Sequence, residues 1–143
     1  MIYHRIMVAY DGSKASEKAL RHAVALAESK PGSRLTVAYV KYRPPFTVGG
    51  YGFIPPSGYD EQLHNYETDL LAKVKTTIAS LSYAGVQVLE GNPAAALLDY
   101  AHANNFDLLV MGNRGMGVLR EWVLGSVSHH VVQHARFPVL VVK

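Results

Sequence analysis

Short, nearly continuous apolar runs recur along the chain and are the first feature of the sequence that predicts structure. They occupy residues 5–10, 34–40, 86–91, 107–112 and 139–143. Continuous rather than alternating apolar character is typical of strands that are buried on both faces of a parallel sheet. Between these runs, apolar residues recur at helical spacing, so we expect strands and helices to alternate along the chain.

Two helices are predicted in the first half of the chain. One begins at Ser13, because a serine side chain can accept from the free N–H groups of a first helical turn. Its apolar face is formed by Ala19, Leu20, Ala23, Val24 and Ala27. A longer helix is predicted over residues 59–82. Its apolar stripe comprises Leu63, Tyr66, Leu70, Val74, Ile78 and Leu81.

Two further helices are predicted in the second half. Asn92 followed by Pro93 is a typical N-cap and first-turn pair, so a helix is expected from there to about Asn104. The last helix is predicted over residues 126–134. By contrast, residues 41–58 hold four prolines and four glycines, and neither a helix nor a strand is expected to persist there.

The alternation predicts an α/β fold, in which a parallel sheet is covered by helices on both faces as a three-layer α/β/α sandwich. A length of 143 residues fits one domain over residues 1–143. Open sheets of this kind bind ligands beyond the carboxyl ends of their strands, where the strand order reverses. Unusual turns follow the first and fourth runs, at residues 11–13 and 112–115, so we place a candidate site there.

Composition narrows the possible functions. No apolar run approaches the ~20 residues that a membrane helix needs, and residues 1–13 lack the layout of a signal peptide, so we expect a cytoplasmic protein without membrane partners. The absence of cysteine excludes disulfides and thiolate metal sites. The net charge of +3 is spread along the chain, which favours an ordinary solvated surface over a nucleic-acid-binding face.

The most informative stretch is "GNRGMGVLREWVLGS", residues 112–126. Gly112 and Gly115 follow a predicted strand, and Gly125-Ser126 opens a predicted helix after a nine-residue spacer. Exposed backbone N–H groups and a helix N-terminus together suit the oxygens of a polyphosphate. The Ser126 hydroxyl can either cap the helix or donate to a phosphate oxygen. Each glycine alone is more often a plain turn residue, so the prediction depends on the whole constellation.

The commoner phosphate-binding motifs do not fit this stretch. No lysine precedes Ser126, as a G-x-x-x-x-G-K-[ST] loop requires, and "GNRGMG" is not the dinucleotide pattern G-x-G-x-x-G. The spacing instead resembles the G-x2-G-x9-G-[ST] motif of the ATP-binding universal stress proteins. The resemblance extends to "VAYDGS", "DLLVMG" and "GSVSHHVVQHARFPVLVVK", and covers the chain apart from residues 41–58. It implies a five-stranded sheet of order 3-2-1-4-5 with four helices.

The same resemblance implies which residues hold the nucleoside. The nucleotide would lie across the first and fourth strands. Asp11 and the backbone of Ala9 and Val40 would contact adenine or ribose, whereas Met111 and Gly112 would line the ribose side. A carboxylate repels phosphates, so Asp11 belongs at the nucleoside end. It can also form a simple Asx-turn that leads into the first helix.

Phosphate contacts are implied for the glycine-rich stretch and the start of the last helix. Gly115, Gly125, Ser126 and Val127 would bind phosphates through backbone N–H groups, with the Ser126 hydroxyl as a further donor. Arg114 lies inside the motif and could pair with a phosphate or remain a solvated loop arginine. Any Mg²⁺ would arrive with the phosphates and be coordinated chiefly by them and by water.

Two other features of the last third invite functional interpretations. His130 and His134 lie four residues apart on a predicted helix, as a metal pair would. No carboxylate completes a ligand set, so we expect a structural or surface role and assign no metal ligands. Trp122 is expected to pack under the phosphate turn rather than against a partner.

Three functions fit these observations. The leading hypothesis is a cytoplasmic stress-response sensor or regulator that binds ATP or another adenine nucleotide and changes conformation on binding. The second is a slow ATPase, although no Walker lysine and no base lie near the phosphate turn, and no catalytic residue is assigned. The third is a nucleotide-independent dimeric interaction module. The resemblance also implies a homodimer through residues 139–143, which would cover an exposed sheet edge.

Overall fold

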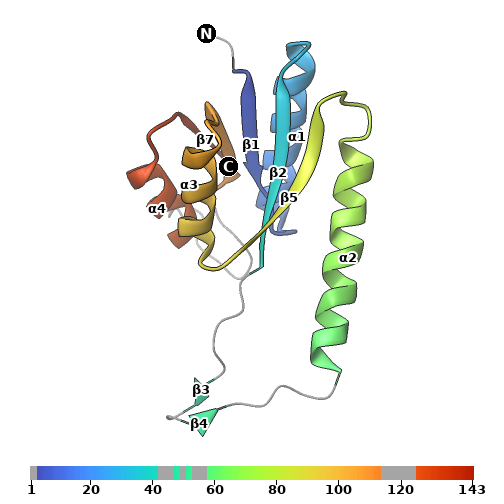
Figure 1. The fold of residues 1–143 in the computed structure, drawn as a ribbon, viewed down its shortest axis with the longest axis vertical. Coiled ribbons are helices and arrows are strands. Elements are labelled where there is room, and N and C mark those ends of the chain that lie inside the picture. Colours follow the sequence, from blue (N-terminus) through green and yellow to red (C-terminus); the bar gives the residue numbers. More distant parts are fainter. Residues whose placement is uncertain (1–2, 42–46, 49–50, 53–57, 114–124) are drawn as a thin grey trace.

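Five parallel strands form the central sheet of the computed structural model, in the spatial order β5–β2–β1–β6–β7 (Figure 1). The structure describes residues 3–41, 47–48, 51–52, 58–113 and 125–143. The sheet comprises β1 (Arg5–Ala9), β2 (Arg34–Lys41), β5 (Ala84–Glu90), β6 (Leu108–Gly112) and β7 (Val139–Val142). Counted within this sheet alone, the strands have the order 3-2-1-4-5, so the predicted topology is confirmed.

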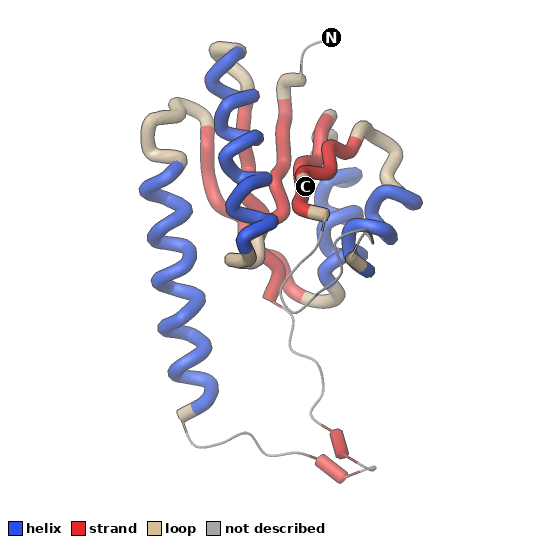
Figure 2. Tube along the Cα trace, turned by 180° about the vertical axis from the view of Figure 1, so that it is seen from behind, coloured by secondary structure: helices blue, strands red, loops and turns tan. Residues whose placement is uncertain are grey.

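Helices cover both faces of the sheet. The described residues form α1 (Lys14–Ser29), α2 (Tyr59–Thr77), α3 (Pro93–Ala103) and α4 (Ser126–His134). Figure 2 shows α1 and α2 on one face, and α3 and α4 on the other. The predicted three-layer α/β/α sandwich with four helices is therefore confirmed.

Each face of the sheet has its own apolar core, because successive residues of a strand point to opposite sides. In β1, Ile6 and Val8 belong to the core under α1 and α2, which includes Leu20 of α1. Met7 of the same strand belongs to the opposite core, together with Val131 of α4. Burial on both sides explains why the central strands are continuously apolar in sequence.

The predicted starts of α1 and α3 are confirmed by their capping hydrogen bonds. The Ser13 hydroxyl accepts from the backbone N–H of Ser16 at 3.1 Å. At α3, the Asn92 side chain accepts from the N–H of Ala95 at 3.1 Å, and Pro93 occupies the first turn. Both caps satisfy N–H groups that have no acceptor within their own helix.

The predicted end of α2 at residue 82 is wrong, because the α-helix ends at Thr77. Beyond it, tighter i→i+3 hydrogen bonds run from Ala79 N–H to Thr76 O at 3.3 Å and from Leu81 N–H to Ile78 O at 3.0 Å. These turns keep Ile78 buried and Leu81 packed against the core. The apolar stripe therefore continues, although the α-helix does not.

Residues 41–58, in which no strand is expected to persist, contain two very short strands among their described positions. The two-residue strands β3 (Thr47–Val48) and β4 (Tyr51–Gly52) pair in antiparallel fashion. A Gly-Gly pair separates them in the sequence, and such a pair is a recognised hairpin signal. β3 and β4 lie apart from the main sheet, toward the amino-terminal end of α2 (Figure 1).

Candidate functional site

β1 and β6 pair in parallel, so their carboxyl ends lie side by side and form the edge at which the sequence predicts a site. β2 lies on one side of β1, whereas β6 and then β7 lie on the other. The strand order therefore reverses between β1 and β6. In open α/β sheets, this reversal is where ligands bind.

Asp11 follows β1 and forms the turn into α1. Its Oδ1 accepts from the backbone N–H of Ser13 at 2.9 Å, and its own N–H donates to Ser16 Oγ at 3.3 Å. The Asx-turn that was predicted as one role of Asp11 is thereby confirmed. The residue remains exposed, so its carboxylate is also accessible to a ligand.

Gly112 ends β6 in close contact with the first turn of α1. A Cβ atom at this position would lie 2.6 Å from Ala15 Cβ and 2.8 Å from the Ala15 backbone carbonyl carbon. Close-packed interiors do not tolerate such contacts, so a side chain here requires the helix or the strand to move. The sequence predicts a ligand contact for Gly112, and the structure adds a packing role.

The two ends of the glycine-rich stretch meet at Asn113, directly after β6. The Asn113 carbonyl accepts from the N–H of Gly125 at 2.6 Å and from the Ser128 hydroxyl at 2.9 Å. The Asn113 N–H donates to Val142 O of β7 at 3.0 Å. The backbone of one residue therefore holds together the end of β6, the edge strand and the start of α4.

α4 begins with backbone donors that have no helical acceptor. Gly125 is its N-cap, and the first bond within the helix runs from His129 N–H to Gly125 O at 2.9 Å. The N–H groups of Ser126, Val127 and Ser128 precede that bond. None of the described residues accepts from these three groups. They form the positive end of the helix dipole, which favours an anion.

The structure corrects two predictions about the first turn of α4. Ser126 is the first helical residue and is exposed, so the alternative that its hydroxyl caps α4 is wrong. The resemblance assigns the Gly125 N–H to phosphate, but in this structure that N–H donates to Asn113 O. An anion here would therefore meet the N–H groups from Ser126 onward, together with the Ser126 hydroxyl.

Four of the residues predicted to contact a nucleotide share one apolar cluster on the α3–α4 face. Met111 is buried in this cluster, whereas Ala9, Val40 and Val127 pack against it as half-buried residues. They come from four different elements, which the fold brings together at the carboxyl edge. An apolar surface beside free N–H donors suits a ligand with an apolar ring at one end and negative charge at the other.

The whole segment 114–124 lies outside the described residues. It includes Arg114 and Gly115, for which phosphate contacts are predicted, and Trp122, for which a packing role is predicted. These roles stay predictions. The described part of the motif consists of Gly112, Gly125 and Ser126.

A polar network lies on the opposite face of β1. The buried Tyr10 hydroxyl donates to Glu17 Oε1, and the same oxygen pairs with Lys73 Nζ at 3.3 Å. Burial, together with the hydrogen bond to this carboxylate, raises the pKa of Tyr10 above its ordinary value. Tyr10 therefore keeps its proton as a donor, and the network joins α1 to α2.

α2 also touches the turn that follows β1. Gly12 has a left-handed backbone, with φ at +87°, and a Cβ there would lie 3.1 Å from Leu70 and 3.2 Å from the Tyr66 hydroxyl. The residues of the predicted apolar stripe of α2 were expected to face the core. Val74 is buried as expected, but Tyr66 is 47% exposed.

Sequence reasoning missed a buried acidic residue, Glu67 of α2. Its carboxylate accepts from the Tyr39 hydroxyl at 2.7 Å, and the two residues are 3% and 8% exposed. A buried carboxylate requires hydrogen-bond partners of this kind. The surrounding residues of α2 are mostly polar and exposed, so the sequence carries no signal that Glu67 is buried.

Among the described residues, no group of three or more histidine, aspartate or glutamate side chains could hold a metal ion. His130 and His134 are exposed, and their stacked rings have centroids 4.3 Å apart. The His134 Nδ1 lies 2.9 Å from the His130 carbonyl oxygen. Within the same part of the chain, no helix has the length and apolar character to cross a membrane.

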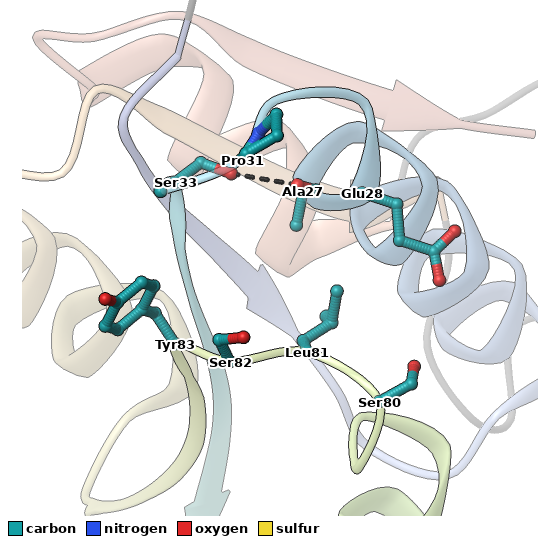
Figure 3. Close-up of a pocket in the computed structure, with 9 residues that line it drawn as sticks. Ala27, Glu28, Pro31, Ser33, Ser80, Leu81, Ser82 and Tyr83 are labelled. Atoms are coloured by element: carbon teal, nitrogen blue, oxygen red, sulfur yellow. Dashed lines mark hydrogen bonds between the residues drawn. The ribbon is translucent and has the colours of Figure 1, made fainter.

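A cavity of about 400 Å³ opens at the opposite end of the sheet (Figure 3). It is lined by the end of α1, the turn before β2 and the connection from α2 to β5. The Ser33 hydroxyl in this lining donates to Ala27 O at 3.1 Å and to Lys30 O at 2.9 Å. No residue predicted for the site lines this cavity, so it is separate from the carboxyl edge.

Both the sequence and the fold are similar to those of known proteins. The model of the universal stress protein family matches residues 2–143. The chain is 32% identical over 149 residues to universal stress protein YxiE of Bacillus subtilis, covering 99% of this chain and 100% of that protein. Universal stress protein UspA from Lactobacillus plantarum has a TM-score of 0.80 at 24% identity, over 100% of this chain and 99% of that one. The universal stress protein from Archaeoglobus fulgidus in complex with dAMP has a TM-score of 0.67 at 26% identity, over 100% of both chains.

Proposed function

Because the chain belongs to the universal stress protein family, we propose that it binds an adenine nucleotide, in the first place ATP, between the carboxyl ends of β1 and β6. The nucleoside lies against Asp11 and the apolar cluster of the α3–α4 face. The phosphates lie at the N–H groups of Ser126 and Val127, with Gly115 and Arg114 supplying further contacts. The protein acts in the cytoplasm as a stress-response sensor or regulator, because the bound nucleotide favours one conformation of the surface around the site.

The junction at Asn113 is the observation that carries this proposal. Its hydrogen bond from Gly125, at 2.6 Å, places the start of α4 beside the end of β6. Donors for phosphate and an apolar surface for a base are thereby brought to one edge of the sheet. Neither feature alone would identify a nucleotide, since helix starts and apolar surfaces are common.

The complex of the Archaeoglobus fulgidus protein supports the adenine assignment. That relative is 26% identical over the full length of both chains and was solved with dAMP. dAMP shares the adenine and the 5′-phosphate with ATP. The complex therefore supports a site for these two groups, which both nucleotides carry. We extend the proposal to ATP because the spacing of Gly112, Gly115, Gly125 and Ser126 resembles the motif of ATP-binding members of the family. Any Mg²⁺ would be held mainly by the phosphates and water.

A variant that places a carboxylate where the phosphate is proposed to bind, at the start of α4, tests the proposal. Gly125→Asp places a carboxylate at the N-cap of α4, where aspartate is favoured because it accepts from the free N–H groups. ATP therefore loses donors and meets a repelling charge. Isothermal titration calorimetry should show ATP affinity reduced by about tenfold or more.

Gly85→Asp is the matched control for this titration. A Cβ at Gly85 meets no heavy atom within 4 Å, and the residue is exposed near the start of β5, away from the carboxyl edge. The same charge there should leave ATP affinity unchanged. Equal affinities for the wild type and Gly125→Asp would contradict the placement of the phosphates.

The edge of the sheet supports a second part of the proposal, a homodimer formed through β7. β7 is the last strand of the sheet, and its Leu140 side chain is 38% exposed. An unpaired apolar edge strand is prone to associate with another strand. Pairing with β7 of a second copy about a two-fold axis satisfies the free N–H and C=O groups of both edges.

A further inference from the structure

Ser128 is the most deeply buried polar residue near the candidate site. It is 2% exposed and is the third residue of α4. Its hydroxyl lies 2.9 Å from the Asn113 carbonyl oxygen and 3.1 Å from the Gly125 carbonyl oxygen. A single hydroxyl proton is therefore shared between the two residues that flank the segment 114–124. Burying a hydroxyl is unfavourable unless it is hydrogen-bonded, and both acceptors are present here.

Apart from the packing of Val127 against the apolar cluster, few polar contacts hold the start of α4 in place. Its N-cap, Gly125, has no side chain that could accept from the first turn. The helix has only nine residues, a length at which an isolated helix is not stable in water. Among the described residues, the first turn is fixed to β6 by the Gly125 N–H and the Ser128 hydroxyl, which both donate to Asn113 O. Ser128 supplies the one side chain in this connection.

We propose that Ser128 is a positioning residue of the nucleotide site: its hydroxyl fixes the first turn of α4 to the end of β6, so that the free N–H groups are already ordered when a phosphate arrives. This inference rests on the proposed function. Without the hydroxyl, part of the binding free energy is used to order the turn, and the affinity falls accordingly. The loss corresponds to a neutral hydrogen bond, which is about a three- to tenfold change in Kd.

Ser33 offers a matched control at the other end of the molecule. It is 6% exposed, and its hydroxyl also donates to two backbone carbonyls, one of which is drawn in Figure 3. Ser33→Ala and Ser128→Ala therefore remove the same group from similarly buried surroundings. Both should lower the melting temperature to a similar extent, but only Ser128→Ala should change nucleotide binding. Ser128→Cys keeps a side chain of similar shape with a much weaker donor, so it should weaken binding as alanine does.

The experiment measures ATP affinity by calorimetry and amide hydrogen exchange of Gly125 by NMR, in the full chain and well below the melting temperature. We expect Ser128→Ala to weaken ATP binding about three- to tenfold and to speed exchange of the Gly125 amide, with both quantities unchanged in Ser33→Ala. Wild-type affinity in Ser128→Ala overturns the inference alone, as does an equal loss in Ser33→Ala. A wild-type protein that binds no ATP overturns the proposed function itself, and the inference with it.

Discussion

At the scale of single residues, Gly112 is fixed by packing as much as by any ligand. Gly112→Ala would place a methyl group 2.6 Å from Ala15 Cβ, and overpacking of this kind typically destabilises a protein by about 1–3 kcal/mol. We expect the urea concentration at the unfolding midpoint to fall accordingly, while the dependence of the unfolding free energy on urea concentration stays unchanged. Gly85→Ala is the comparison, because open space surrounds Gly85. If both variants unfolded at the same urea concentration, the close approach of α1 to β6 would be contradicted.

Tyr10 should make the stability of the folded protein depend on pH. An unfolded tyrosine loses its proton near its ordinary pKa of about 10, but burial and Glu17 raise the pKa of Tyr10 in the folded state. Above pH 10 the unfolded chain therefore binds fewer protons than the folded one, and stability falls as the pH rises. Below the ordinary pKa this contribution is fully present.

Urea unfolding between pH 8 and about pH 11.5 measures this effect. The free energy of unfolding should fall more steeply above pH 10 in the wild type than in Tyr10→Phe, which has no proton to lose. Tyr83→Phe is the control, since Tyr83 is 57% exposed, and it should keep the wild-type slope. Parallel profiles for the wild type and Tyr10→Phe would contradict the buried network.

The sequence alone predicts the hydrogen-bond partners of some residues but not of others. Asp11, Ser13 and Asn92 were predictable, because the hydrogen bonds that their side chains accept come from only two or three residues along the chain. Ser128 was not, because its acceptor on Asn113 lies 15 residues away and is brought close only by the fold. Glu67 depends in the same way on Tyr39, which is 28 residues away. A periodic pattern shows which face is apolar, but not which polar group finds a partner.

At the scale of elements, the cap of α3 can be tested by itself. Asn92→Ala removes the acceptor of the Ala95 N–H, and losing an N-cap side chain typically lowers stability by about 1 kcal/mol. Thermal unfolding should show the corresponding drop in melting temperature. Asn65→Ala makes the same substitution at an exposed position within α2, where alanine is the better helix former. It should be neutral or slightly stabilising, and a similar loss in both variants would argue against the cap.

The boundaries of elements were harder to predict than their existence. The apolar stripe of α2 runs on to Leu81, so the pattern indicates a helix to residue 82. The structure keeps the same residues on the core with tighter turns after Thr77. Hydrophobic spacing does not distinguish an α-helix from the short 3₁₀-type turns that follow it. β3 and β4 were missed because two-residue strands are too short to produce an alternating pattern.

At the scale of the whole molecule, the strand order came from a resemblance and not from the residues. Apolar runs predict a parallel sheet, but they do not say which strands are neighbours. The proposed dimer depends on that order, because it makes β7 one edge of the sheet and β5 the other. The two edges can therefore be compared within one chain.

Leu140→Arg should convert a dimer into monomers, because it places a charge on the exposed apolar position of β7 that pairing would bury. Light scattering after size-exclusion chromatography measures this directly. Val88→Arg introduces the same charge on β5, where Val88 is 36% exposed against 38% for Leu140, and should leave the dimer intact. A wild type that is monomeric, or a dimer that persists in Leu140→Arg, would contradict an interface through β7.

We propose that the start of α4 and the end of β6 together hold the phosphates of an adenine nucleotide. A titration of ATP into the ¹⁵N-labelled protein, followed by amide NMR, probes this contact at single residues. We predict saturable shifts of the Ser126 and Val127 amides at submillimolar ATP, with the amides of residues 80–83 in the distant cavity unchanged. Amide shifts confined to that cavity, or no saturable shift below millimolar ATP, would contradict this placement of the phosphates.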